Sequence, residues 1–271
     1  MKENQQPITG CGAGDTAPYV FLCGDPERIP KVTESWSDVR EVCRIREYLI
    51  HTGVYDGVEM TAASTGVGGP STAVVMEELV KLGGHTFIRV GNSGALADEV
   101  ALGDYVITTG SIRDEGTSKS YVRDEYPASA HFEVTAALVR AAQADRARHH
   151  VGITWSIDGF YARNKVAGPE DTLISMSVNG YEQSWQNDLL RDMKAARVLN
   201  VEMESSTILT LANLFGVRAG CICTVSDRTP WPGPGQDMIT LDKNIHGAIE
   251  VATKAMVSLA GTGHKPPEKV V

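Results

Sequence analysis

The sequence lacks the long apolar runs and the clustered positive charge that would mark several protein classes. No stretch approaches the ~20 consecutive apolar residues that a membrane-spanning helix needs, and the first ten residues, MKENQQPITG, lack the apolar core of a signal peptide. We therefore expect a cytoplasmic protein without a membrane partner. The chain has 25 lysines and arginines against 34 aspartates and glutamates, and the net charge of −9 argues against nucleic acid as a partner.

The sequence also lacks a pattern of paired cysteines. The five cysteines are an odd number, they are scattered along the chain, and no CxxC pair occurs. This pattern argues against a disulfide framework. Cys221 and Cys223 are two residues apart and would share one face of a strand, and we interpret them as buried core residues in preference to a metal or redox pair.

Apolar runs of strand length alternate with helical patterns, which predicts an α/β fold. Strands are expected at Tyr19–Cys23, Tyr48–Tyr55, Val58–Ser64, Thr86–Val90, Tyr105–Thr109, His150–Ile157, Val198–Val201 and Val217–Val225. Helices are expected from Gly66–Ser71 through Leu82 and at Phe132–Arg146, Trp185–Ala196, Ser205–Phe215 and Asp242–Leu259. The polar stretch Tyr161–Gln183 and the Pro- and Gly-rich segment Arg228–Asp237 are expected to be loops. Without a repeat or linker, residues 1–271 should form one domain, with a core of about 17–261 and frayed ends.

Two strand ends carry residues that suit an anion. Gly24 and Arg28 follow the first strand, at a strand-to-helix junction with free backbone N–H groups. Arg89 ends another strand and is followed directly by a GNSG segment, in which Asn92 and Ser93 offer hydrogen bonds. Two arginines and exposed amides suit a phosphate dianion. Taken alone, the pattern favours the alternative that the arginines form surface salt bridges and the glycines only turn the chain.

Two further strand ends carry carboxylates. Glu202 and Glu204 are two residues apart, so they could point into one cleft and accept hydrogen bonds from sugar hydroxyls, with Met203 as an apolar surface between them. Equally, they could stabilise the N-terminus of the following helix. Asp227 is a candidate general acid, with Arg228 beside it on a mobile flap. A turn or capping aspartate is the alternative, and the isolated pattern favours it.

The motifs GDPERI, IREY, STGVGGPST, ELVKLG, TFIRVGNSGAL, GDYVITTGS, DGFY, NVEMES and VSDRT occur in this order between about Val20 and Ala260. In order and spacing they resemble the nucleoside phosphorylase family, and within it the uridine phosphorylase branch. The resemblance implies a single α/β domain whose central mixed sheet is partly closed into a barrel and surrounded by helices. It also implies a homo-oligomer, either a dimer or a hexamer built as a trimer of dimers, whose active sites borrow residues from the neighbouring subunit.

The resemblance implies that the enzyme uses inorganic phosphate as co-substrate to split a nucleoside into a free base and ribose 1-phosphate, with no organic cofactor. Phosphate would be bound by Gly24, Arg28, Arg89 and Asn92, and by Arg46 from the neighbouring subunit. Ribose would be bound by Ser93, Glu202, Met203 and Glu204, and the base by Phe160, Asn164 and Asp227. The catalytic residues would be Arg89, Glu204, Asp227 and Arg228. Glu47, Val67 and Ser71 match the positions at which bacterial uridine phosphorylases hold a potassium ion at the dimer interface.

The base-binding segment departs from the uridine phosphorylases. They bind uracil through a glutamine and an arginine in a segment like FYxGQxR, whereas FYARNKV places Asn164 and Val166 there. Arg163 or Lys165 could substitute. Asp227 stands where uridine phosphorylases have an amide, and where bacterial purine nucleoside phosphorylases have an aspartate that protonates N7. Losing a buried polar partner costs ~1–3 kcal/mol, which is enough to change specificity, so uracil, a purine and a modified base all stay open.

Two other functions fit parts of the pattern. A phosphate-independent nucleosidase would use water on the same fold, although hydrolysis does not need the three arginines Arg28, Arg46 and Arg89. A catalytically silent nucleoside-binding protein would explain the altered base-binding residues. It would not explain why Glu204 and all three arginines are present.

Overall fold

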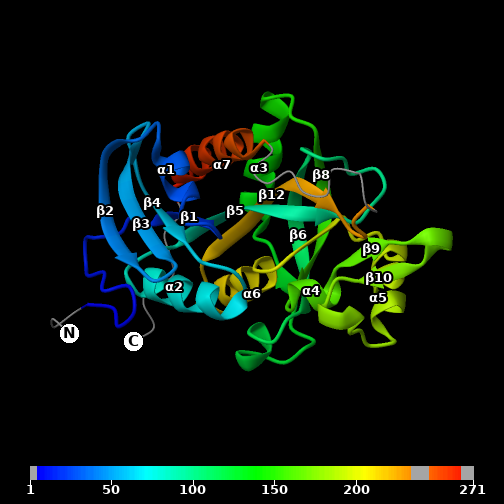
Figure 1. The fold of residues 1–271 in the computed structure, drawn as a ribbon. Helices are drawn as coiled ribbons and strands as arrows, with labels where there is room; N and C mark the ends of the chain where they lie inside the picture. The colour runs from blue at the N-terminus through cyan, green and yellow to red at the C-terminus, as the bar shows by residue number, and fades with distance from the viewer. Residues whose placement is uncertain (1–4, 233–243, 264–271) are drawn as a thin grey trace.

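The computed structural model describes residues 5–232 and 244–263, and its main feature is a ten-stranded mixed sheet (Figure 1). The strands are β1 (Tyr19–Cys23), β2 (Ser37–Ile45), β3 (Tyr48–Tyr55), β4 (Val58–Ser64), β5 (Thr86–Ala95), β6 (Tyr105–Asp114), β7 (Ala128–Ser129), β8 (His149–Ile157), β11 (Asn200–Glu202) and β12 (Arg218–Arg228). Their order is β11-β8-β6-β12-β5-β1-β4-β3-β2, and β7 pairs with β6.

Five of these strands close into a barrel. β11 lies parallel to β8 at one side and antiparallel to β5 at the other, through Asn200 opposite Ala95 and Val201 opposite Gly94. The ring therefore runs β11-β8-β6-β12-β5 and returns to β11. β1, β4, β3 and β2 continue from β5 as an open extension. The predicted α/β fold with a partly closed mixed sheet is confirmed.

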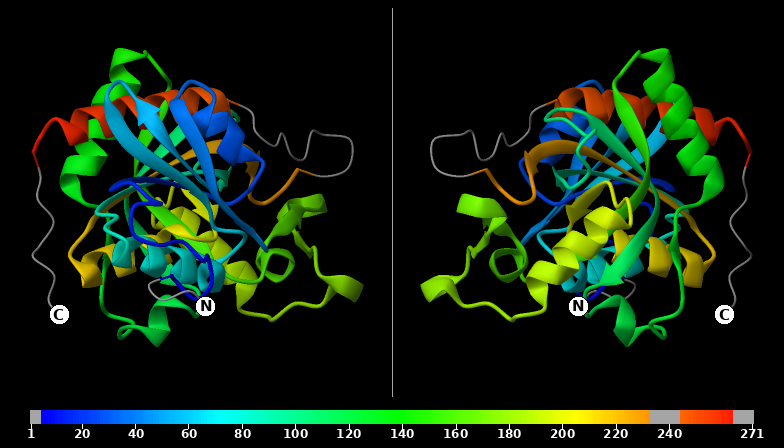
Figure 2. Two further views of the ribbon diagram at one scale, coloured as in Figure 1. Left: turned by 90° about the vertical axis from the view of Figure 1, so that its left-hand side faces the viewer. Right: turned by 90° about the vertical axis from the view of Figure 1, so that its right-hand side faces the viewer.

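Helices cover both faces of this sheet (Figure 2). They are α1 (Arg28–Thr33), α2 (Gly69–Lys81), α3 (Phe132–Ala144), α4 (Phe160–Arg163), α5 (Gln186–Ala195), α6 (Ser205–Phe215) and α7 (Ile245–Ala260). Side chains of a strand alternate between its faces. In β1, Phe21 and Cys23 therefore pack with α1, α3 and α7, whereas Val20 and Leu22 pack with α2 and α6. Among the described helices, none is long and apolar enough to cross a membrane.

Several predicted elements differ from the structure. β5 extends to Ala95 and β6 to Asp114, beyond the predicted ends at Val90 and Thr109. β2 was not predicted, because its pairing with β3 is interrupted by irregularities and most of its residues are exposed, which removes the two-residue alternation. The stretch Tyr161–Gln183 is not a plain loop. It contains most of α4 and a small hairpin of β9 (Lys165–Ala167) and β10 (Leu173–Ser175), elements too short to show a period. With α5 they lie together at one side of the molecule (Figure 1).

Other expectations concern the chain ends and the cysteines. The last helix is confirmed from Ile245, whereas residues 242–243, 233–237 of the predicted loop and 264–271 of the predicted frayed tail lie outside the described residues. All five cysteines are buried and unbridged. Cys221 and Cys223 do share one face of β12, and their sulfur atoms lie 3.6 Å apart.

Candidate active site

A cavity of about 630 Å³ lies at the carboxyl ends of β1, β4, β5 and β12. These strands are parallel, so the loops that follow them meet at one edge of the sheet, which is the usual ligand site of such folds. The cavity is lined by twelve of the predicted site residues: Gly24, Arg28, Val67, Arg89, Asn92, Ser93, Phe160, Asn164, Glu202, Met203, Glu204 and Asp227. The structure therefore brings together segments that lie far apart in the sequence.

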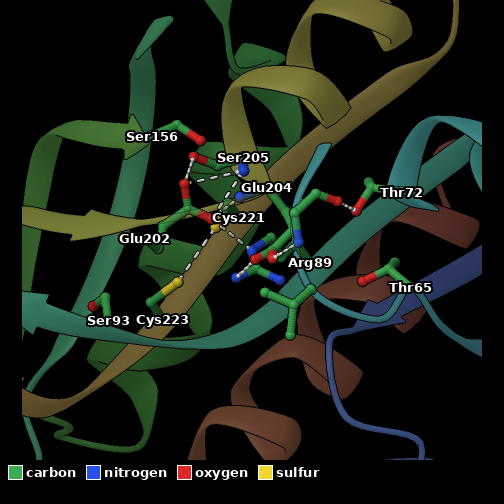
Figure 3. Close-up of polar contacts among 12 residues, drawn as sticks. Thr65, Thr72, Arg89, Ser93, Ser156, Glu202, Glu204, Ser205, Cys221 and Cys223 are labelled. Atoms are coloured by element: carbon green, nitrogen blue, oxygen red, sulfur yellow. Dashed lines mark hydrogen bonds and ion pairs between the residues drawn. The ribbon is translucent and has the colours of Figure 1, made fainter. Parts of the chain in front are cut away.

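Arg89 lies between two carboxylates in the floor of the cavity (Figure 3). Its Nε donates to Glu202 at 2.9 Å, and a terminal nitrogen donates to Glu204 at 2.6 Å. Burial alone would lower the pKa of Arg89, but the charges of Glu204 and Glu202 outweigh it and hold that pKa well above its usual value. The other terminal nitrogen, Nη1, is buried without a hydrogen-bond partner among the described residues. Arg89 is therefore a permanent cation with a donor left for an anion.

Apart from Arg89, which both contact, Glu202 and Glu204 have different partners. The Glu202 carboxylate accepts the backbone N–H of Glu204 at 2.9 Å and both the N–H and the hydroxyl of Ser205, at 2.8 and 2.6 Å. This arrangement supports the start of α6, which was the alternative interpretation of the motif. Glu204 instead accepts the N–H of Gly68 at 2.6 Å, and so joins the loop before α2 to the cavity. Of the two, Glu204 has more free acceptor capacity toward the cavity.

Arg28 brings a second guanidinium to the same part of the cavity. It is 7% exposed at the start of α1, and its charge acts on the Glu204 carboxylate. Arg28 and Arg89 therefore both lie around Glu204 instead of forming separate surface salt bridges. Two buried guanidinium groups beside a cavity form a site for a doubly charged oxyanion.

Asp227 lies at an irregularity in the pairing of β12 with β5 and lines the same cavity. Its side chain approaches Gly94 so closely that a Cβ there would lie 2.6 Å from Oδ1, so any larger residue at this position would displace the Asp227 carboxyl group. Oδ1 is buried without a hydrogen-bond partner among the described residues. Burial raises the pKa of Asp227 from 3.8 to about 6. A carboxyl group with such a pKa can hold a proton near neutral pH, as a general acid must.

Asn164 closes the cavity near Asp227. Its amide nitrogen donates to the Phe160 carbonyl at 2.9 Å, and its amide oxygen accepts the Thr229 hydroxyl at 3.2 Å. The Phe160 ring makes an edge contact with Trp231 at 5.8 Å between centroids. Thr229 was not among the predicted site residues, although it lies two positions after Asp227 in the same motif. An amide, a hydroxyl, a carboxyl and an aromatic ring therefore form this end of the cavity.

Arg163 and Lys165, the two cations beside Asn164 in the sequence, point away from the cavity. Arg163 pairs with Asp114, and its guanidinium lies 5.7 Å from the ring centroid of Trp155 and 5.0 Å from that of Trp185. Lys165 is fully buried and donates to Glu182 at 2.8 Å. Neither side chain lines the cavity. The suggestion that one of them substitutes for a missing base-binding arginine is therefore wrong.

Arg228 and Arg46 also lie outside the cavity of their own chain. Arg228 is the last residue of β12, not part of a flap, and donates to the carbonyls of Val100 at 2.7 Å and Ala97 at 3.3 Å. Arg228 was expected to be a catalytic residue, but its side chain points away from the cavity. Neighbouring residues of a strand point to opposite faces, and Asp227 occupies the face toward the cavity. Arg46 is exposed in the β2–β3 turn, with a φ of 53°.

Three candidate potassium ligands meet beside the cavity. A Cβ on Gly66 would lie 2.8 Å from Glu47 Cγ and 3.3 Å from Ser71 Oγ, so both side chains surround this turn. The Ser71 hydroxyl lies 3.5 Å from the Val67 carbonyl. Val67 itself is 76% exposed at the cavity rim.

The fold and this cavity are typical of an α/β enzyme, and the lining suits an oxyanion beside a polar, ring-containing molecule. The chain belongs to the phosphorylase superfamily, whose family model matches residues 18–259. It is 48% identical to a uridine phosphorylase of Thermococcus kodakarensis, over 83% of this chain and 78% of the relative. It is 37% identical to a uridine phosphorylase of Treponema pallidum, over 91% of both chains. It is also 37% identical to a guanosine phosphorylase of Halorubrum lacusprofundi, over 82% of this chain and 83% of the relative. The predicted family and enzyme class are confirmed.

Proposed function

We propose that this protein catalyses the phosphorolysis of a nucleoside to a free base and ribose 1-phosphate, and that its preferred base is a purine. The observation that carries the first part is the placement of Arg28 and Arg89 around Glu204 in one cavity. The relatives named uridine phosphorylase and guanosine phosphorylase support the same reaction type.

The proposed roles follow from the charge that develops during the reaction. Breaking the N-glycosidic bond builds positive charge on the ribose, while the electrons of the bond move to the base. Arg28 and the unpaired Nη1 of Arg89 hold phosphate below the anomeric carbon. Glu204 accepts hydrogen bonds from the ribose hydroxyls, and its negative charge favours the cationic sugar. Phe160 packs on the base.

The choice of base rests on Asp227. A purine leaves most easily when its N7 is protonated, and Asp227 is a buried carboxyl group with a pKa of about 6 and an unpaired oxygen. Uridine is the second candidate, because several relatives are named uridine phosphorylase. Neither Arg163 nor Lys165 takes the place of the arginine that would bind uracil, which supports the purine.

A panel of nucleosides with phosphate tests the proposal, with products identified by chromatography. We expect guanosine or inosine to be cleaved with a kcat/KM at least about 10-fold above that of uridine, equivalent to about 1.4 kcal/mol. Faster cleavage of uridine would overturn the purine assignment but not the reaction. Undiminished base release in phosphate-free buffer would instead indicate a nucleosidase. Binding without cleavage of any nucleoside would indicate a silent binding protein.

We also propose that a second copy of the chain supplies Arg46 to this cavity, in a dimer or in a hexamer built from such dimers. Its exposure in the β2–β3 turn supports this assignment. Inactive Arg46→Ala and Arg89→Ala proteins, mixed under conditions of subunit exchange, should regain activity in about a quarter of their sites. Half of the dimers would be mixed, and each would contain one intact site. Failure to regain any activity after proven exchange would refute the shared site.

The oxygen atoms of Glu47, Val67 and Ser71 suit a hard monovalent cation, and we propose that they hold potassium. Bound potassium would fix the turn before α2 and contribute no chemistry. The melting temperature should rise in potassium chloride relative to choline chloride at equal ionic strength. The rise should disappear in Ser71→Ala.

A further inference from the structure

The N-terminal arm (residues 5–17) carries a buried thiol that lies against the edge strand β2. The arm is held to α2 by Glu78, whose carboxylate accepts the backbone N–H groups of Ile8 and Thr9 at 2.8 Å each. Cys11 is fully buried, and its sulfur lies 3.9 Å from the carbonyl of Val42 in β2. The next residue of β2 is Cys43. The arm therefore brings a cysteine to a cysteine across 32 positions of sequence.

Cys11 and Cys43 are direct neighbours in the folded chain. Both side chains belong to one buried cluster, and the Cys11 sulfur contacts the carbonyl of Val42, the residue directly before Cys43. Cys43 also lies 3.8 Å from the carbonyl of Tyr48, which holds its side chain toward the inside of the β2–β3 hairpin. Neither thiol lines the catalytic cavity, and neither has a role in the proposed reaction.

We propose that Cys11 and Cys43 form a redox-dependent disulfide that ties the N-terminal arm to the hairpin carrying Arg46. The oxidant is a small disulfide such as glutathione disulfide. The Cys11 thiolate attacks one of its sulfur atoms and releases one glutathione thiol, and Cys43 then attacks the Cys11 sulfur and releases the second. The two protein thiols thereby lose two electrons and two protons, which the two glutathione molecules carry away.

The local chemistry favours Cys11 as the attacking group. The neighbouring Cys43 side chain lowers the pKa of the Cys11 thiol, although burial opposes this effect. The Cys11 side chain, together with burial, raises the pKa of Cys43. Because Cys11 is fully buried, the arm must lift transiently before the oxidant reaches it, so oxidation should be slow in the folded protein.

The other thiol pair provides an internal comparison. Cys221 and Cys223 lie two residues apart on one strand, whereas a disulfide at Cys11 and Cys43 would close a long loop and constrain the unfolded chain. Closing such a loop should raise the melting temperature by about 5–10 °C. Oxidation of Cys221 and Cys223 would close almost no loop and would not produce such a rise.

The test uses the full chain, incubated with glutathione disulfide or with dithiothreitol, then unfolded in the presence of iodoacetamide. Reduced protein should take up five adducts and oxidised protein three, and peptide mapping should find Cys11 joined to Cys43. Oxidation should raise the melting temperature of the parent and of Cys223→Ser, but not of Cys11→Ser or Cys43→Ser. Each variant is compared with its own reduced form, so a general loss of stability does not affect the result. Five adducts after oxidation, a Cys221–Cys223 link, or a retained rise in Cys11→Ser would overturn the proposal.

Discussion

Replacing Asp227 by asparagine should make the folded protein more stable at neutral pH while it impairs cleavage of purine nucleosides. The side chain keeps its shape but loses a charge that burial disfavours. The pKa of Asp227 is raised from 3.8 to about 6. A carboxyl group whose pKa is higher in the folded state favours folding at low pH, and this contribution is lost as the pH rises through the folded pKa.

The size of the effect follows from these two values. Above pH 7 the ionised aspartate costs the folded state about 3 kcal/mol relative to a neutral side chain, and at pH 4.5 the cost is about 1 kcal/mol. Asp227→Asn should therefore raise the melting temperature by about 5–10 °C at pH 7.5 and by clearly less at pH 4.5. The gain should be visible without substrate, because it arises from burial alone.

Thermal unfolding of parent and variant between pH 4.5 and 8 measures this difference. Asp192→Asn, an exposed aspartate of α5, is the matched control and should show no such pH dependence. With saturating phosphate, kcat for a purine nucleoside should fall by about 10²–10⁴ in Asp227→Asn, because the general acid is lost. A stability difference that stays constant with pH, or a variant less stable at pH 7.5, would refute the buried-acid reasoning. Unchanged purine turnover would refute the catalytic role.

Three further predictions concern the charged groups around the cavity. Arg89→Met should lower the free energy of unfolding by about 3–5 kcal/mol, because two buried carboxylates lose their cation, and denaturant titration should detect this loss. Glu202→Gln should mainly lower the melting temperature, because it weakens the start of α6, whereas Glu204→Gln should mainly lower kcat. Equal changes in melting temperature and kcat for the two variants would contradict these separate roles. Arg228→Ala should change kcat/KM by less than about 2-fold, because the side chain donates to backbone carbonyls outside the cavity. A larger loss at unchanged phosphate affinity would show that Arg228 takes part in catalysis.

Much of the site could be predicted because its residues lie in short motifs at or near strands. Arg28 follows β1, whereas Arg89 and Asp227 lie within β5 and β12, and these parallel strands bring their carboxyl-terminal parts to one edge of the sheet. Singly, these patterns favoured surface salt bridges and a capping aspartate, and only the order and spacing of all the motifs, which resemble one family, predicted a common site. The register that closes β11 onto β5 could not be predicted, because β11 is only three residues long.

Roles within a motif were harder to assign than the motif itself. Glu202 and Glu204 look equivalent in the sequence, but one supports the start of α6 and the other joins Gly68 to the cavity. Asp227 and Arg228 are neighbours, yet they lie on opposite faces of β12. These differences depend on which partner each side chain meets, and the partners come from other parts of the chain.

The sequence by itself determined the family, the α/β class and the positions at which strands end in phosphate- and sugar-binding residue types. These properties are local, since they depend on hydrophobic periodicity and short motifs. Only the tertiary structure decided that Asp227 is buried with no ion pair among the described residues, that Arg163 pairs with Asp114 away from the cavity, and that Cys11 lies beside the strand of Cys43. Each of these depends on long-range packing, which sets the dielectric environment and the neighbours of a side chain and leaves no periodic trace in the sequence.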